Sequence, residues 1–327
     1  MTPTGEFKDM TWIPGGTFLM GCDDFYPEEG PVHEASVGGF WMDEHAVTVA
    51  EYWRFVRATG HVTVAERALD PAQYPGAEPG VLVPGSLVFD PPAGRVDLRD
   101  PRHWWSWVPG AQWRHPEGPG STASGRDRHP VTQVAYEDAA AFAAWAGKDL
   151  PSEAEWERAA RGGLEGATYA WGDEFSPRGK TMANTWHGRF PWEDLKDARH
   201  RGTVPVKRFP PNGYGLYEMT GNVWEWTSDL FRPRHRTPGH PAPGHPARGP
   251  GGGSPGCCGP GDPPAGTPGP GRVQPPPGGP IPRRVVKGGS YLCAPDYCLR
   301  YRPAARQGQA VETSSTHLGF RCVIRTS

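Results

Sequence analysis

The chain has 327 residues, and its 34 Lys plus Arg nearly balance its 36 Asp plus Glu, which leaves a net charge of −2. This balance gives no electrostatic reason to expect nucleic acid or an anionic membrane as a partner. No apolar run approaches the roughly 20 residues that span a bilayer, and the polar N-terminus does not read as a signal peptide, so we expect a cytoplasmic protein.

The aromatic content indicates a folded core, because disordered chains are poor in aromatic residues and this one has 14 Trp, 10 Tyr and 12 Phe. Its 45 Gly and 40 Pro indicate many loops and a low-complexity insert. Six cysteines are too few for a disulfide scaffold of this length.

Short strands and a capped helix are predicted near the N-terminus. The residue pattern favours strands over Met10–Ile13 and Thr17–Met20, joined by the turn Pro14-Gly15-Gly16. A helix should begin after Thr48, because Glu51 completes a capping box with it.

The stretch Leu69–Arg128 is rich in turn residues and has few periodic runs. Aromatic residues in such irregular backbone usually belong to a packed segment, and a peptide-binding wall is the alternative. We therefore expect a packed segment, whose tryptophans are Trp104, Trp105, Trp107 and Trp113.

A strand and two helices are predicted next. Val131–Ala135 favours a strand, and the Ala-rich run Glu137–Ala146 favours a helix. Ser152 and Glu155 form a second capping box, which starts another helix.

Residues 233–283 are predicted to form a disordered insert. About 60% of the residues from Pro233 to Arg284 are Gly or Pro, so this stretch cannot bury enough surface to offset its ordering entropy. Cys257 and Cys258 lie in it and are expected to be exposed thiols. Residues 284–327, beginning with a strand at Val285–Lys287, are too short for a core of their own. They should form one domain with residues 1–232.

The sharpest chemical feature is the pair Cys293 and Cys298, in a C-x4-C spacing that Pro295 keeps out of a helix. A structural disulfide is disfavoured in a reducing compartment, and a zinc site lacks a second ligand pair. A two-thiolate site for a soft ion such as Cu(I) is the third interpretation. The neighbouring Arg300 and Arg302 would lower the thiol pKa values.

The Gly-rich run from Gly213 to Asp229 lacks the lysine of a phosphate-binding loop. Asn222 and Glu225, three residues apart among glycines, suit a hard cation such as Ca²⁺. A packed, Trp-rich turn with a solvated glutamate is the alternative.

Several blocks together resemble the formylglycine-generating enzymes, or sulfatase-modifying factors. The resemblance covers nearly the whole chain except the insert, and the block from Lys287 to Arg306 is its most specific part. The blocks are Met10–Gly21, Trp113–Gly118, His129–Val131, Trp145–Glu157, Asn212–Tyr217, Gly221–Asp229, Lys287–Ser290 and His317–Cys322.

This resemblance implies a single α+β domain of low regularity, related to the C-type-lectin fold. It implies an oxidase that uses O2 to convert the cysteine of a C-x-P-x-R motif, in an unfolded or nascent sulfatase, to Cα-formylglycine. A monomer is expected. The alternatives are a non-catalytic peptide- or sugar-binding module of the same fold and an iron-dependent sulfur-transferring oxygenase. The second alternative would need a histidine-rich domain that this chain lacks.

The resemblance also implies site residues. Cys293 and Cys298 would hold Cu(I), and Ser290 and Trp226 would line the oxygen pocket beside it. A structural Ca²⁺ would be held by Asn222 and Glu225 through their side chains and by Gly221 and Val223 through their backbone oxygens. A second Ca²⁺ would be held by Asn184, Thr185 and Asp197.

Two departures from the family pattern stand near these positions. Better-known members carry His-x-Ser-Tyr between the two cysteines, where this chain has Ala294, Pro295, Asp296 and Tyr297. His317 stands where some members carry Asn.

Overall fold

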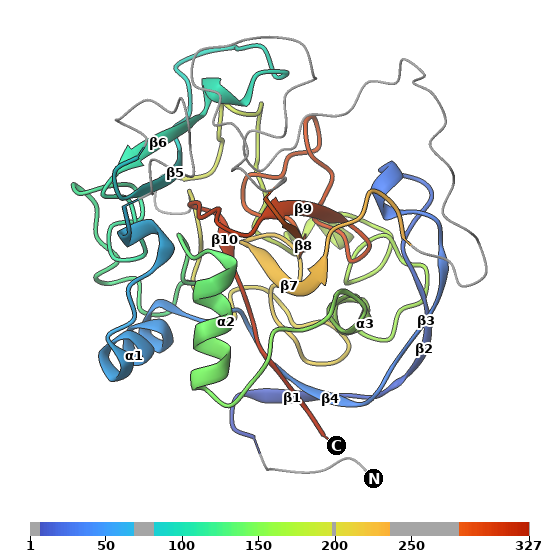
Figure 1. Ribbon diagram of the computed structural model, residues 1–327. Helices are drawn as coiled ribbons and strands as arrows, with labels where there is room; N and C mark the ends of the chain where they lie inside the picture. The colour runs from blue at the N-terminus through green and yellow to red at the C-terminus, as the bar shows by residue number, and fades with distance from the viewer. Residues whose placement is uncertain (1–6, 69–81, 198–200, 236–280, 327) are drawn as a thin grey trace.

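The computed structural model describes residues 7–68, 82–197, 201–235 and 281–326 (Figure 1). Its helices and strands are short and separated by long irregular segments, which confirms the α+β class of low regularity. The helices are α1 (Val49–Thr59), α2 (Tyr136–Trp145) and α3 (Glu153–Arg161). The strands are β1 (Met10–Ile13), β2 (Gly16–Met20), β3 (His33–Val37), β4 (Phe40–Asp43), β5 (Gly85–Phe89), β6 (Trp105–Pro109), β7 (Trp224–Leu230), β8 (Arg283–Lys287), β9 (Arg306–Ala310), β10 (Leu318–Gly319) and β11 (Val323–Arg325).

The two predicted capping boxes start α1 and α3. The Thr48 hydroxyl accepts the backbone N–H of Glu51, whose carboxylate accepts the N–H of Thr48 in return. Ser152 and Glu155 repeat both bonds at the start of α3. Each reciprocal pair satisfies two N–H groups that a helix start otherwise leaves without partners.

The predicted strand at Val131–Ala135 is wrong, although the segment is fully buried. Its N–H groups donate to separate parts of the chain: that of Val131 to Val47 and that of Gln133 to Ser315. Gln133 also has φ of 61°, which breaks an extended backbone. The segment is therefore an irregular buried connection that leads into α2.

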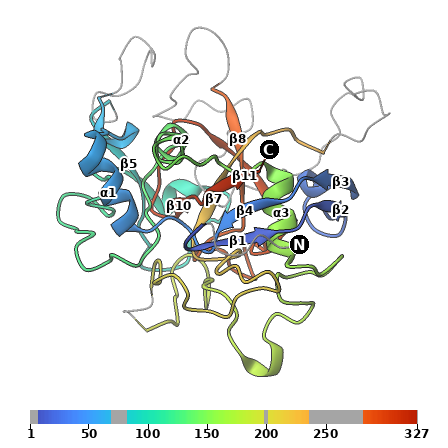
Figure 2. The ribbon, with the colours of Figure 1, turned by 90° about the horizontal axis from the view of Figure 1, so that it is seen from below.

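The central sheet has the order β10-β7-β8-β9, and a second sheet has the order β1-β4-β11. Figures 1 and 2 show α1 and α2 together on one side of β7, with α3 on the other. The predicted turn at Pro14–Gly16 does not join paired strands, because β1 pairs with β4 while β2 pairs with β3. It carries the chain from one sheet to another.

Within residues 82–128 the predicted packed segment is confirmed, because Trp104 and Trp113 are 1% and 2% exposed. Its antiparallel hairpin of β5 and β6 was not predicted. Residues 69–81 lie outside the described chain.

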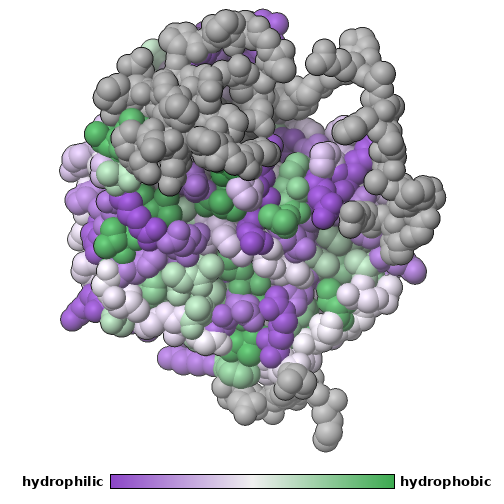
Figure 3. Space-filling model, viewed as in Figure 1, coloured by the Kyte–Doolittle hydropathy of each residue, from purple (hydrophilic) through white to green (hydrophobic). Residues whose placement is uncertain are grey.

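On the face shown in Figure 3, hydrophobic side chains are interspersed with hydrophilic ones. Such dispersed apolar exposure is ordinary for a folded protein.

The two sides of the predicted insert meet in the central sheet. The backbone N–H of Phe231 donates to the carbonyl of Arg283, and Leu230 pairs with Arg284 across β7 and β8. Strand β8 thus begins at Arg283, the last residue assigned to the insert. Cys257 and Cys258 lie outside the described residues. Among those that are described, no helix is both long and apolar enough to cross a membrane.

Candidate active site

The two cysteines lie on a tight turn that follows β8. The carbonyl of Ala294 accepts the N–H of Cys298 at 2.7 Å, which closes the turn. Upstream, Gly289 has φ of 69°, and a Cβ there would stand 2.7 Å from the backbone oxygen of Arg300. Only glycine fits such a close approach, so this residue lets the turn fold back against the segment that follows Cys298.

The turn brings the two sulfurs together, as one interpretation of the C-x4-C spacing requires. The Sγ atoms of Cys293 and Cys298 are 3.1 Å apart, and the residues are 1% and 0% exposed. A disulfide would place them about 2.05 Å apart. Among the described residues, no group of three or more His, Cys, Asp and Glu side chains is arranged to hold a metal. The donor set, two converging sulfurs, fits Cu(I).

Ser290 contacts this pair, and Trp226 belongs to the same buried cluster. The N–H of Ser290 donates to Cys293 Sγ at 3.4 Å, and its hydroxyl lies 2.9 Å from Nδ1 of His317. Trp226 on β7 is fully buried in the same hydrophobic cluster as both cysteines, and its indole N–H donates to the carbonyl of Val134. The structure therefore brings together the four residues predicted for the copper and oxygen site.

An aromatic wall borders the turn, and its contacts between distant segments were not predicted. The ring of Tyr297 stacks on Phe190 with a centroid distance of 4.5 Å and meets Trp104 edge-on at 5.7 Å. Trp105 packs against His317 with a centroid distance of 4.9 Å. These residues come from four separate segments, so sequence spacing gives no sign that they meet.

Arg300 and Arg302, which were predicted to lower the pKa values of the two thiols, each pair with a carboxylate, and their effect on the thiols stays a prediction. Arg300 pairs with Glu28 at 2.6 Å, and Arg302 forms a bidentate pair with the fully buried Glu29. Their charges are balanced by these carboxylates, so they fasten the chain after Cys298 to the N-terminal region.

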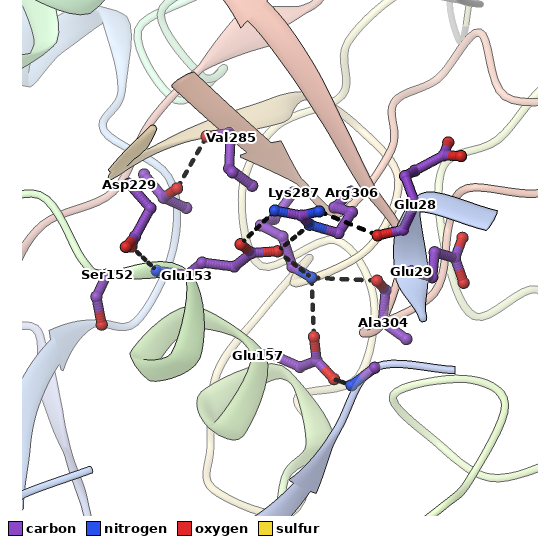
Figure 4. A network of polar contacts seen from close by, with 12 residues as sticks. Glu28, Glu29, Ser152, Glu153, Glu157, Asp229, Val285, Lys287, Ala304 and Arg306 are labelled. Carbon is purple, nitrogen blue, oxygen red and sulfur yellow. Dashed lines mark hydrogen bonds and ion pairs between the residues drawn. The ribbon is translucent and has the colours of Figure 1, made fainter. Parts of the chain in front are cut away.

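A buried charge network surrounds Lys287, at the start of the block from Lys287 to Arg306 (Figure 4). The ammonium of Lys287, 0% exposed, lies 2.9 Å from Glu157 and 3.6 Å from Glu153, and Arg306 binds Glu153 through two nitrogens. Burial opposes ionisation of Glu157, but Lys287 and Arg161 outweigh it and hold its pKa at about 2. The network joins α3, β8 and β9 just before the cysteine turn.

A cavity of about 660 Å³ opens beside the turn. Asp296, which stands between the two cysteines in sequence, is part of its wall. The lining combines apolar, acidic and basic side chains: Arg95, Val96, Asp97, Leu98, Arg189, Trp192 and Asp296.

The residues of the first predicted calcium site do not fit that role well. The Asn222 oxygen accepts N–H bonds from Val204 and Asn184, which use both of its acceptor positions. The Glu225 carboxylate accepts two bonds from Arg321 and one from the indole of Trp156. Its charge already has a buried counter-ion. Calcium at this position stays a prediction that these contacts do not support.

Gly221 and Val223, which were predicted to bind the same calcium ion through their backbone oxygens, are both buried. The N–H of Gly221 donates to the carbonyl of Gly288, and Val223 is 2% exposed. The bond from Gly221 therefore joins the segment before β7 to the start of the block from Lys287 to Arg306.

The second predicted calcium site contains a lysine. The ammonium of Lys196 donates to the Asn184 side-chain oxygen at 3.2 Å and to the Thr185 carbonyl at 3.0 Å. It also lies 3.8 Å from the carboxylate of Asp194. The predicted acidic ligand, Asp197, is exposed.

Comparisons with known proteins identify the family of this chain. The model of the sulfatase-modifying factor enzyme 1-like domain matches residues 1–326. A formylglycine-generating enzyme of Mycobacterium tuberculosis is 52% identical over 95% of this chain and 96% of the relative. A formylglycine-generating enzyme of Thermomonospora curvata is 42% identical over 98% of this chain and 95% of the relative. A mouse relative named inactive C-alpha-formylglycine-generating enzyme 2 is 35% identical over 96% and 84%.

Among solved structures, PvdO from Pseudomonas aeruginosa shares the fold, with a TM-score of 0.57 and 24% identity over 99% of this chain and 98% of that one. The family model covers nearly every residue, and the relatives above cover 95% or more of the chain at 35% identity or higher. The chain therefore belongs to the sulfatase-modifying factor family, which includes the formylglycine-generating enzymes.

Proposed function

We propose that this chain is a copper-dependent oxidase that converts the cysteine of a C-x-P-x-R segment in a sulfatase to Cα-formylglycine, with O2 as acceptor. The proposal extends to this chain the activity named in its bacterial relatives. The observation that carries it is the buried pair Cys293 and Cys298, with sulfurs 3.1 Å apart. Two such soft donors suit Cu(I), and a substrate thiolate is a third donor of the same kind.

The overall reaction balances with a thiol reductant as co-substrate. The group CH2SH, O2, two electrons and two protons give CHO, hydrogen sulfide and water. One Cβ–H bond and the Cβ–S bond of the substrate break, and a carbonyl forms. When bound, copper would supply the electron transfer to O2 and a binding position for the substrate sulfur.

The side chains of this chain would prepare that chemistry. The N–H of Ser290 donates to Cys293 Sγ, and a donor at that position favours negative charge on the sulfur. The cysteines and Trp226 lie in a hydrophobic cluster, which keeps bulk water from the reacting sulfur.

The cavity beside Asp296 supports a peptide substrate. Val96, Leu98 and Trp192 offer apolar surface for a proline, and Asp97 and Asp296 offer carboxylates for an arginine. We therefore propose that the residues after the substrate cysteine bind in this cavity.

A non-catalytic binding module is the second candidate, because the family includes a relative that is named inactive. The aromatic wall around Tyr297 would serve such a binder. The buried thiol pair favours the oxidase, since a binding surface has no use for two sulfurs beneath it. We also propose that the protein is a cytoplasmic monomer; the free thiols of its described cysteines fit a reducing compartment.

The test is a peptide assay. The full chain, with and without Cu(I) loading, is incubated with a short C-x-P-x-R peptide, O2 and a mild thiol reductant, and the peptide is analysed by mass spectrometry. Conversion of CH2SH to CHO that requires both copper and oxygen supports the oxidase. Bound copper without conversion indicates a different substrate motif, and neither binding nor conversion favours the binding module.

A further inference from the structure

The strongest feature that the proposed function leaves unexplained is the buried lysine at the second predicted calcium site. The Lys196 side chain is 10% exposed and its ammonium contacts three oxygen-bearing groups, on Asn184, Thr185 and Asp194. Side-chain amide, backbone carbonyl and carboxylate oxygens are the donors that Ca²⁺ takes. Here they surround a positive charge that the chain itself supplies.

The charges around this position oppose a second cation. Calcium needs six to eight oxygens at about 2.3–2.6 Å, so it would have to contact the same oxygens as the ammonium. Arg201 adds another positive group, whose guanidinium donates to the backbone oxygens of Lys196 and Asp194.

The lysine holds a segment that reaches the cysteine turn. The side-chain amide of Asn184 donates to Asn222, and the N–H of Asn222 donates back to the Asn184 carbonyl. Two residues along, the N–H of Trp186 donates to the carbonyl of Cys293 at 2.9 Å. A cation at Asn184 and Thr185 therefore stabilises the backbone on which one of the two site cysteines rests.

We propose that Lys196 is a tethered cation that replaces the second calcium ion in this chain, so that the segment from Asn184 to Trp186 supports the cysteine turn without Ca²⁺. The proposal does not depend on the oxidase activity, since its readouts are calcium content and melting temperature.

The test uses three variants of the full chain and measures bound calcium and thermal unfolding with a chelator or with millimolar Ca²⁺. Lys196→Ala should lower the melting temperature by about 5 °C in the chelator, whereas Lys196→Arg should stay close to wild type. The exposed Lys180→Ala is the matched control and should not shift.

A fourth variant converts the site. Lys196→Asp places a carboxylate ligand where the ammonium stood, so it should melt lower in the chelator, recover with Ca²⁺, and bind one more Ca²⁺ per chain than wild type. Two results would overturn the proposal. One is a Ca²⁺ ion in the wild-type chain that Asn184→Ala removes. The other is a melting temperature that Lys196→Ala leaves unchanged.

Discussion

The hydroxyl of Ser290 lies 2.9 Å from Nδ1 of His317 and also accepts the N–H of Leu292. Through its own N–H, Ser290 contacts the sulfur of Cys293. His317 is thereby linked to the thiol pair through Ser290, although Ser290 and His317 are 27 positions apart in the chain. This geometry makes His317 a positioning residue for Ser290.

We expect His317→Ala to lower kcat about tenfold with little change in KM, because one buried hydrogen bond contributes about 1–1.5 kcal/mol. His317→Asn keeps a hydrogen-bonding group and should recover much of the loss. A change in KM alone, or equal loss in both variants with the fold intact, would contradict this role.

Cys293→Ser and Cys298→Ser should each abolish Cu(I) binding at the site and turnover, because oxygen is a poor ligand for this soft ion. Copper stoichiometry, peptide turnover and circular dichroism measure the effect. Cys22→Ser, outside the turn, is the control and should retain activity. Full activity in both site variants would exclude the proposed mechanism.

Breaking the buried ion pair between Glu225 and Arg321 should cause a large loss of stability. Both side chains are almost fully buried, so Glu225→Gln leaves a guanidinium without its counter-charge and should cost about 3–5 kcal/mol of unfolding free energy. Glu117→Gln breaks an exposed pair with Arg126 and should cost about 0–1 kcal/mol. Urea unfolding of both variants measures the difference, and similar losses would refute the explanation.

Glu157 should make the free energy of unfolding depend on pH in the acid range. Its pKa is about 2 in the folded chain against an ordinary value of 4.5, so between these values the unfolded chain binds more protons. Its contribution is complete above about pH 4.5 and is lost as the pH falls towards 2.

Glu157→Gln should therefore flatten the dependence of unfolding free energy on pH in that window. The exposed Glu165→Gln serves as the control. An unchanged slope in Glu157→Gln, measured by urea unfolding from pH 2.5 to about 5, would show that this carboxylate is not held ionised.

We propose that residues 1–232 and 284–327 form one domain around an insert. Because Phe231 and Arg283 already bond across β7 and β8, a short Gly/Ser linker in place of residues 236–280 should close the hairpin. The trimmed chain should keep one cooperative unfolding transition, while a deletion extended through β8 should not fold. Loss of the transition in the first variant would show that the insert belongs to the folded domain.

What the sequence predicted correctly rests on short-range chemistry. The capping boxes at Thr48 and Ser152 involve residues three apart, so their partners stand next to them in the sequence. The turn that brings Cys293 and Cys298 together likewise spans only a few residues. These features needed no knowledge of the rest of the chain.

The tertiary structure decided where the charges and the aromatic rings go. Arg302 finds its carboxylate on Glu29, 273 residues away in the sequence. Val131–Ala135 has the composition of a strand, yet its N–H groups bond to separate segments. Lys196 reads as an ordinary surface lysine until its ammonium is found among oxygens. Buried charges and backbone groups must find partners wherever the whole fold supplies them, and local sequence does not record that pairing.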